Sequence, residues 1–360
     1  MEFSKKRILS APFAAMLSVT NRCNLVCGYC CNNSNIDYKD DMNREELLDV
    51  LEQLAEMKIF IVHFTGGEMF TREDIFDIFD TVKPWQKFTI RTNGTCITHN
   101  QIDRLGAYAN FGGVGVSIDG SCEAINSSTR GKGNFEKSIS TVKYMIQKGL
   151  WINIMFTVTK YNQTDIANMT ALAEELGCKL TLNKLDPIGR AAQDQYFTRE
   201  ELDELCEKIY KIDQAHPNVL QAGLFIERYH YTQKIGANIS ICNKNHDRAL
   251  SLCDVGFSFV YINADGNVYP CSTMTEPVLG NVREERLKFI WQNSRALKEI
   301  RSFKNMKMSD IQCEKETCRY SSNCFPGCRA ISQRLTGSHY KTDPFWCLNT
   351  QRLPGAHQDA

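Results

Sequence analysis

The sequence predicts an α/β protein built on a parallel sheet that curves into a partial (β/α)6 barrel. Six short apolar runs of the fully buried kind alternate with helical segments, and this alternation favours parallel strands joined by right-handed crossovers. Towards the carboxyl end the pattern changes to a stretch of spaced cysteines, which indicates a second, cysteine-rich unit. We therefore expect an amino-terminal segment (1–12), the barrel (13–225), a bridging region (226–250) and a cysteine-rich domain (251–360).

The expected elements follow from local periodicity and from turn residues. Strands, most of them running into a turn, are expected in residues 13–20, 59–68, 87–94, 113–120, 151–159 and 179–189. Helices are expected in residues 43–58, 72–83, 134–149 and 165–177, and one further helix in residues 283–303. The stretch INADGNVYPC (262–271) predicts a hairpin that turns at Asp265 and Gly266.

Polar and small residues follow the carboxyl ends of four of the expected strands. Cys23, Gly66, Asn93 and Asp119 each stand just after such a strand. Chemistry in parallel barrels collects on the loops at this end. We therefore expect these four residues to share one mouth.

Composition and charge set the compartment and exclude some partners. Forty-two basic residues balance 42 acidic ones, so nothing favours a nucleic acid or an anionic membrane as the partner. Lys5, Lys6 and Arg7 before an apolar run imitate a signal peptide, but Pro12 interrupts that run. No stretch approaches the roughly 20 apolar residues that span a bilayer. A cytoplasmic protein with reduced thiols is expected.

The sixteen cysteines are then metal ligands or redox groups rather than a disulfide framework. Cys23, Cys27 and Cys30 stand in one tight loop, TNRCNLVCGYCCNNSN (20–35), and a structural zinc would ordinarily need a fourth ligand nearby. Cys31 is adjacent, but we expect it to point away from the loop. Three thiolates on a four-iron cluster would leave one iron open to a small molecule.

Four motifs in chain order resemble those of the radical S-adenosylmethionine (SAM) enzymes. They are CxxxCxxC at Cys23, TGGE at Thr65, TNG at Thr92 and SIDG at Ser117. The resemblance implies a [4Fe–4S] cluster on the three cysteines, whose open iron is chelated by SAM. Reductive cleavage of SAM would then give a 5′-deoxyadenosyl radical, which removes a hydrogen atom from the substrate.

The same resemblance implies which residues bind SAM. Gly66, Gly67 and Glu68 match the turn that binds the methionyl amine, and glycines let a backbone approach a ligand. Tyr29 matches a position near adenine, although simple packing is the alternative. Ser117 matches a ribose contact and Arg130 a carboxylate contact, unless Arg130 is a solvated loop charge. Asn93 is either a SAM contact or a turn residue before Gly94.

The carboxyl-terminal cysteines resemble the SPASM extension of this family, which holds two auxiliary iron–sulfur clusters. Carried over by position, the outer cluster takes Cys313, Cys318, Cys324 and Cys347. The inner cluster takes Cys253, Cys271 and Cys328, with Cys242 as the candidate fourth ligand; an open iron or a smaller cluster is the alternative. The family's second block begins CxxC, whereas here Cys313 and Cys318 are separated by four residues.

Five cysteines match no cluster position, and we expect them to behave as small hydrophobic residues: Cys31, Cys96, Cys122, Cys178 and Cys206. If the reaction needs a hydrogen-atom donor, Cys96 and Cys122 are the candidates because they lie on mouth loops. Apart from these two, the sequence names no catalytic residue.

Function divides by substrate. The SPASM resemblance and the LDPIGRA stretch (185–191) imply modification of a ribosomally made peptide or protein by a crosslink, thioether, epimerisation or oxidation. A dehydrogenase or epimerase acting on a small molecule, such as a sugar, aminocyclitol, quinone precursor or tetrapyrrole, is the alternative. A plain iron–sulfur electron carrier is disfavoured, because it would not need the GGE and SIDG loops. We expect a flavodoxin- or ferredoxin-type reductant, and leader-peptide recognition by the barrel or by another chain.

Overall fold

The computed structural model describes residues 9–237, 253–313, 327–345 and 347. Within these ranges ten strands form one sheet, in the order β10-β9-β8-β1-β2-β3-β4-β5-β6-β7. The strands are β1 (Ala14–Ser18), β2 (Ile61–Thr65), β3 (Lys87–Thr92), β4 (Phe111–Ser117), β5 (Ile152–Val158), β6 (Lys179–Lys184), β7 (Leu220–Gln221), β8 (Phe259–Ile262), β9 (Asn267–Tyr269) and β10 (Gly280–Asn281).

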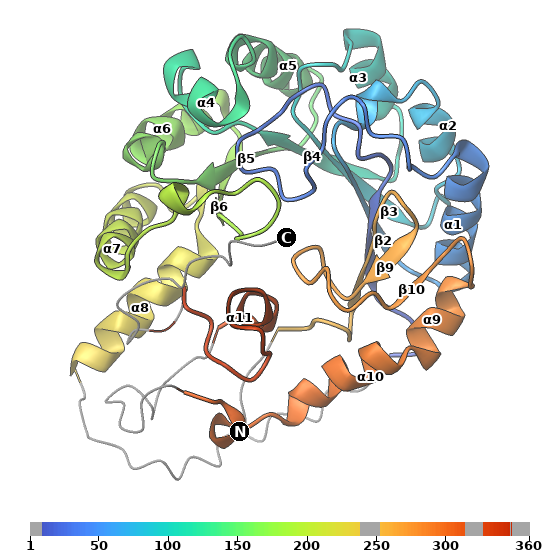
Figure 1. Cartoon of the computed structure of the whole chain (residues 1–360). Coiled ribbons are helices and arrows are strands. Elements are labelled where there is room, and N and C mark those ends of the chain that lie inside the picture. The colour runs from blue at the N-terminus through green and yellow to red at the C-terminus, as the bar shows by residue number, and fades with distance from the viewer. Residues whose placement is uncertain (1–8, 238–252, 314–326, 346, 348–360) are drawn as a thin grey trace.

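The first six strands are the six expected ones, and each pairs in parallel with the next. Ala14 lies opposite Ile61 in β2, and Val114 of β4 lies opposite Ile152 of β5. The sheet curves through an arc with helices on its outer side, and it stays open between its end strands β10 and β7 (Figure 1). The α/β class and the parallel, partly closed barrel are confirmed. The short strand β7 extends the sheet beyond the expected six.

The helices are α1 (Arg44–Glu56), α2 (Ile75–Asp80), α3 (His99–Gly106), α4 (Glu123–Arg130), α5 (Phe135–Gln147), α6 (Ile166–Leu176), α7 (Arg199–Ala215), α8 (Gly223–Ala237), α9 (Leu287–Asn293), α10 (Arg295–Ser302) and α11 (Arg329–Thr336). Several begin as their sequences suggest. Asn43 and Glu46 form a reciprocal capping box at α1, and Thr98 and Gln101 do the same at α3.

The main core lies between the sheet and the helices. Alternate strand residues such as Val62, Phe64, Phe88 and Ile90 are fully buried there. The ring of Phe88 meets those of Phe64 and Tyr108 edge-on and that of Phe111 at a tilt, which adds aromatic packing to the apolar burial. The other residues of each strand therefore face the inside of the arc.

The cysteine-rich part shares the barrel's sheet. The hairpin β8–β9 turns at Asp265 and Gly266 as expected, with Gly266 at a φ of 85°. However, β8 also pairs in parallel with β1, so that Ala14 lies opposite Phe259. The four-part division of the chain stays a prediction, and the sheet runs without a break across two of its parts.

The single helix expected in residues 283–303 is wrong in one respect, because the structure has two helices there. Ser294 has a φ of −50° and a ψ of 120°, which is not helical, and its side chain accepts a hydrogen bond from the amide of Leu297. Serine competes with the helical backbone in this way, so it ends α9 and caps α10.

No helix in the described ranges is long and apolar enough to cross a membrane.

Candidate active site

The first three cysteines lie in the loop that joins β1 to α1, at the carboxyl end of β1. Cys23 is buried, Cys27 and Cys30 are half-buried, and none of the three is in a disulfide. Backbone bonds shape the loop: the amide of Cys23 donates to the carbonyl of Asn35, and that of Cys30 donates to Cys27. The loop therefore has a defined conformation around its thiols.

Arg72 ties the two ends of this loop together. Its guanidinium donates to the carbonyl of Val19 at 3.1 Å, where β1 ends, and to that of Met42 at 3.0 Å, just before α1. Asp74 pairs with the same guanidinium and completes its bonding. Arg72 therefore holds the two ends of the cysteine loop at a fixed separation.

The glycine turn after β2 lies against the cysteine loop itself. The amide of Gly67 donates to the carbonyl of Thr20 at 2.7 Å, and that of Glu68 donates to Arg22 at 2.8 Å. A β-carbon on Gly66 or Gly67 would come within 2.3 Å of the carbonyl oxygen of Thr20 or Arg22, respectively. These glycines are required by the close approach of two backbones, a reason that the sequence analysis did not foresee.

Glu68 holds the next turn. Its carboxylate is fully buried and accepts from the Thr92 hydroxyl at 2.8 and 2.9 Å and from the amide of Asn93 at 2.7 Å. Burial raises the pKa of Glu68, although these bonds oppose the shift. Its contact with an ammonium stays a prediction, and the structure adds a role in joining the loops after β2 and β3.

Asn93 is a turn residue, one of the two alternatives that the sequence left open, and its contact with SAM stays a prediction. Its side-chain oxygen accepts from the amide of Thr95 at 2.8 Å, which is a turn contact. Its Nδ2 donates to Asn24 at 2.9 Å and lies 4.0 Å from the sulfur of Cys23. The structure therefore brings the loops after β1, β2 and β3 together at one mouth.

Tyr29, Asp119 and Arg130 contact one another at the same mouth, where Asp119 and Arg130 are buried and Tyr29 is half-buried. Arg130 Nε lies 2.7 Å from Asp119, and the Tyr29 hydroxyl lies 2.5 Å from both partners. Burial opposes the charge of Arg130, but Asp119 and Tyr29 outweigh it and raise the pKa of the guanidinium. The alternative of a solvated loop charge for Arg130 is wrong, because Arg130 ends α4 and is buried.

Ser117 ends β4 beside this trio in sequence, opposite Met155 in β5, and is half-buried. Because successive strand residues alternate between the two faces of the sheet, Ser117 lies on the same inner face as Gly115, two residues earlier.

The LDPIGRA stretch after β6 packs on the cysteine loop, a contact that the sequence analysis missed. Arg190 donates through Nε to the carbonyl of Cys27 at 2.9 Å and through its guanidinium to Ser34 at 3.0 Å. Its amide donates to Cys30 at 3.0 Å. Gly189, at a φ of 65°, leaves no room for a β-carbon, which would lie 2.2 Å from the carbonyl oxygen of Cys30. The Gly189–Arg190 pair in the loop that follows β6 was the available signal.

A second group of thiols lies in the carboxyl-terminal part of the chain. Burial raises the pKa of Cys271 to about 12, and charges at Cys328 and Cys253 add to the effect, so these three thiols share one neighbourhood. The backbone amide of Cys328 also donates a hydrogen bond to the carboxylate of Asp343 at 3.0 Å. Of the other expected ligands, Cys313 and Cys347 are half-buried, while Cys242, Cys318 and Cys324 lie outside the described residues.

Two family models match this chain, one over the first cysteine loop and one over a range that includes Cys253 and Cys271. The Radical SAM superfamily model matches residues 17–173, and the SPASM model, described as an iron–sulfur cluster-binding domain, matches residues 253–324. The chain is a radical SAM enzyme with a SPASM domain. S-adenosylmethionine and iron–sulfur clusters are therefore its cofactors.

Curated relatives of this radical SAM enzyme differ in what their names say. The AdoMet-dependent heme synthase of Oleidesulfovibrio alaskensis is 28% identical over 94% of this chain and 88% of its own length. The subtilosin biosynthesis protein AlbA of Bacillus subtilis is 25% identical over 94% of this chain and 72% of its own. The mycofactocin maturase MftC of Mycolicibacterium smegmatis is 26% identical over 90% of this chain and 80% of its own length.

Solved structures share the fold. SuiB of Streptococcus suis bound to its precursor peptide SuiA superposes with a TM-score of 0.72 at 18% identity, over 94% of this chain and 76% of that one. The protein named anSMEcpe, with bound AdoMet and a peptide, superposes with a TM-score of 0.67 at 20% identity, over 92% of this chain and 93% of that one.

The donor set of the radical SAM enzyme fits an iron–sulfur cluster on its first loop. Burial, together with the charges at Glu68, Cys27 and Cys30, raises the pKa of Cys23 to about 12, so the thiolates need nearby positive charge. In the described part of the chain no three His, Cys, Asp or Glu side chains are grouped tightly enough for one metal ion. A cluster of several irons spaces its thiolates more widely.

The cysteines that match no cluster position divide by burial. Cys178 and Cys206 are buried, as expected of small hydrophobic residues. Cys31 and Cys122 are exposed, so for them that expectation is wrong. Cys96 is half-buried, with its sulfur 3.9 Å from the Thr95 hydroxyl.

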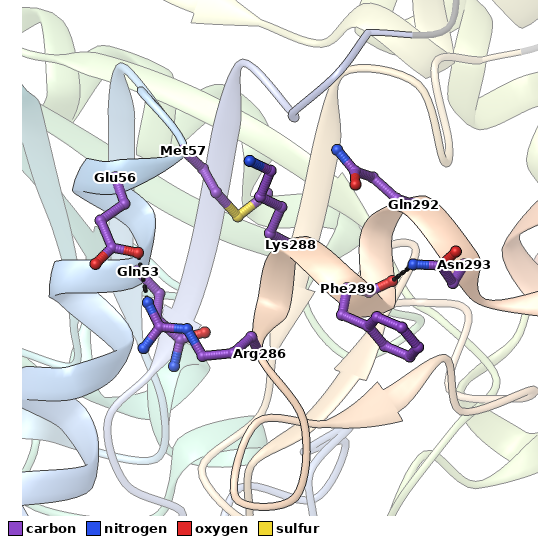
Figure 2. A pocket seen from close by; sticks show the side chains of 8 residues that line it. All are labelled: Gln53, Glu56, Met57, Arg286, Lys288, Phe289, Gln292 and Asn293. Atoms are coloured by element: carbon purple, nitrogen blue, oxygen red, sulfur yellow. Dashed lines mark hydrogen bonds and ion pairs between the residues drawn. The ribbon is translucent and has the colours of Figure 1, made fainter.

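A pocket of about 300 Å³ lies away from the mouth, between α1 and α9 (Figure 2). Figure 2 shows Arg286 reaching across to Glu56, with which it pairs; Asp49 pairs with the same guanidinium. Helix α1 ends beside the start of β2, so this pocket lies at the opposite end of the strands from the cysteine loop. This position gives the pocket no evident part in the chemistry.

Proposed function

We propose that this radical SAM enzyme modifies a ribosomally made peptide or protein, by forming a crosslink or thioether, by epimerisation or by oxidation. The observation that carries the proposal is that one chain combines the CxxxCxxC loop with a second group of thiols, Cys253, Cys271 and Cys328. Similarity to AlbA, MftC and SuiB over at least 90% of this chain supports a peptide substrate.

The specific alternative is a small-molecule substrate, a tetrapyrrole above all. The AdoMet-dependent heme synthases and a pre-heme d1 synthase match as much of the chain as the maturases do. The two substrates are separated by product analysis, as described below.

In this proposal Cys23, Cys27 and Cys30 hold a [4Fe–4S] cluster, which when loaded supplies reductive cleavage of SAM to a 5′-deoxyadenosyl radical. The surrounding residues bind and orient SAM. The contacts with SAM come from Gly66, Gly67, Glu68, Asn93, Ser117, Tyr29 and Arg130. Arg190, Arg72 and Glu68 keep the loops in register, which keeps the reacting atoms in place.

Two auxiliary clusters, both [4Fe–4S], complete the proposal. The inner one is held by Cys253, Cys271 and Cys328 with Cys242, and the outer one by Cys313, Cys318, Cys324 and Cys347. They accept the electron that remains after hydrogen abstraction, or they position the substrate. A flavodoxin- or ferredoxin-type protein supplies the first electron, and a separate chain or the barrel recognises a leader peptide.

Iron content tests the cofactor part. The protein purified and reconstituted without oxygen should carry about twelve irons, or about ten if the inner cluster has two. Replacing Cys23, Cys27 and Cys30 with alanine should abolish 5′-deoxyadenosine formation while the auxiliary absorbance persists. Zinc in place of iron and sulfide, or unchanged cleavage in the triple variant, would refute it.

Mass spectrometry tests the substrate part. The short peptides encoded beside the gene are incubated with enzyme, SAM and reductant; a crosslink or thioether removes two hydrogens, and epimerisation in D₂O adds one deuterium. A porphyrin incubated in parallel tests the alternative. If the peptides stay unchanged and the porphyrin is converted, the peptide proposal fails and the small-molecule one replaces it.

A further inference from the structure

Arg91 is a basic side chain on the inner face of the arc, and its position is set by the pleat of β3. Phe88 and Ile90 point outward into the core, so Thr89 and Arg91 point inward. His63 of β2 confirms this face, because its Nδ1 lies 2.7 Å from the Thr89 hydroxyl. A β-carbon on Gly115 of β4 would lie 3.5 Å from Cγ of Arg91, so the arginine also reaches over the neighbouring strand.

Arg91 is accessible to solvent and yet surrounded by protein. Its side chain is exposed, while burial lowers its pKa and only a charge at Cys31 opposes that shift. Both properties are expected of a group that lines an internal hollow rather than the outer surface. Gly115 keeps the space beside the arginine open, since any side chain there would also press on Met155 at 3.2 Å.

No carboxylate pairs with the guanidinium among the residues that the structure describes. Arg91 makes no hydrogen bond or ion pair with any of them. The two buried carboxylates at the mouth are already bonded, Glu68 to Thr92 and Asn93, and Asp119 to Arg130. Burial and the charge of Arg91 lower the pKa of His63, so the neighbouring imidazole is neutral at neutral pH. Arg91 therefore presents a cation without a paired carboxylate to the inside of the arc.

A cation in such a place is costly unless water or an anion solvates it. We propose that Arg91 binds a carboxylate of the substrate inside the barrel. This inference deepens the proposed function, on which it rests, by naming a group that the substrate carries. A guanidinium presents two parallel N–H donors that match the two oxygens of a carboxylate. One positive charge beside a neutral imidazole suits a monoanion better than a phosphate dianion.

The carboxylate has two chemical sources, a peptide and a tetrapyrrole, and the experiment has an arm for each. Reconstituted enzyme with SAM bound is incubated with a mixture of short peptides in which every acidic or carboxylate-ended member has an amide counterpart. A second incubation offers a porphyrin with four propionates and its tetra-amide. Retained ligands are measured by mass spectrometry, and SAM affinity and iron content are measured on the same samples.

The wild type should retain carboxylates over amides in one of the two arms, and the arm identifies the source. Arg91→Gln should lose that preference by about tenfold or more, and Arg91→Lys should keep part of it. Lys87→Gln is the matched control, because Lys87 lies on the same face of β3 at its far end and should leave the preference unchanged. Circular dichroism checks the fold of each variant.

The proposal is overturned if the wild type shows no preference in either arm, if Arg91→Gln keeps the preference, or if Arg91→Gln weakens SAM binding instead. Failure of the proposed function looks different, because the wild type would then bind a carboxylate but form no modified peptide. Selectivity that is lost in Arg91→Gln and kept in part in Arg91→Lys, with SAM affinity and iron content unchanged, supports carboxylate binding by the guanidinium.

Discussion

Replacing Gly67 with alanine should detach the glycine turn from the cysteine loop. The new β-carbon would lie 2.3 Å from the carbonyl oxygen of Arg22, whereas ordinary contact begins at 3.4 Å, so the two backbones must separate by about 1 Å. The bonds from Gly67 to Thr20 and from Glu68 to Arg22, now 2.7 and 2.8 Å, would then be broken. Two lost buried bonds cost about 2 to 5 kcal/mol.

The assay is iron content of the first cluster, 5′-deoxyadenosine formation and urea unfolding of the reconstituted protein. We expect Gly67→Ala to lose the first cluster and SAM cleavage and to keep the auxiliary absorbance. Gly28→Ala is the control within the cysteine loop, because its β-carbon would meet only Gln195, at an ordinary 3.5 Å. If Gly67→Ala unfolds like the wild type and loads the first cluster fully, the backbone contact does not hold the loop.

Three further predictions follow from side chains around the mouth. Arg190→Ala removes two side-chain hydrogen bonds to the cysteine loop, so it should lower the iron content of the first cluster and reduce the free energy of unfolding by about 1 to 3 kcal/mol. Arg104→Ala removes only an exposed ion pair and should reduce the free energy of unfolding by less than about 1 kcal/mol. Equal losses in the two variants would contradict this prediction. Asp119→Asn leaves Arg130 buried without its counter-charge and should lower the free energy of unfolding, measured in urea, by about 3 to 5 kcal/mol. An unfolding midpoint equal to that of the wild type would show that the ion pair does not stabilise the fold. Because the pKa of His63 is lowered by burial and by Arg91, the unfolded chain takes up the proton first, so stability falls as pH drops below 6.5. His63→Gln should show a shallower fall between pH 7.5 and 5.5, and an unchanged slope would show that His63 does not contribute.

Strands and the shared mouth could be read from local sequence because both depend on short-range signals. Apolar runs and the residues after them placed Cys23, Gly66, Asn93 and Asp119 at one end of the sheet, where the structure has them. The Asp265–Gly266 turn was equally local, since a tight hairpin needs a residue with positive φ.

What the sequence could not show depends on partners distant in the chain. Arg190 lies 163 residues from Cys27, whose carbonyl it binds, and nothing near either residue indicates the other. Asp119 was expected only as a mouth residue, but its buried pairing with Arg130 and Tyr29 is set by how α4 packs. The break at Ser294 was missed because helical periodicity continues on both sides of it.

The parallel pairing of β1 with β8 also has a consequence for synthesis of the chain on the ribosome. Ala14 finds its partner Phe259 only after 245 more residues have been added. At about 5 to 20 residues per second, this takes roughly 12 to 50 s, during which that edge of β1 has no strand beside it. An apolar strand with an unpaired edge invites pairing with another chain. Slow translation or crowded nascent chains should therefore favour aggregation through β1, which makes chaperone supply and expression temperature decisive for soluble yield.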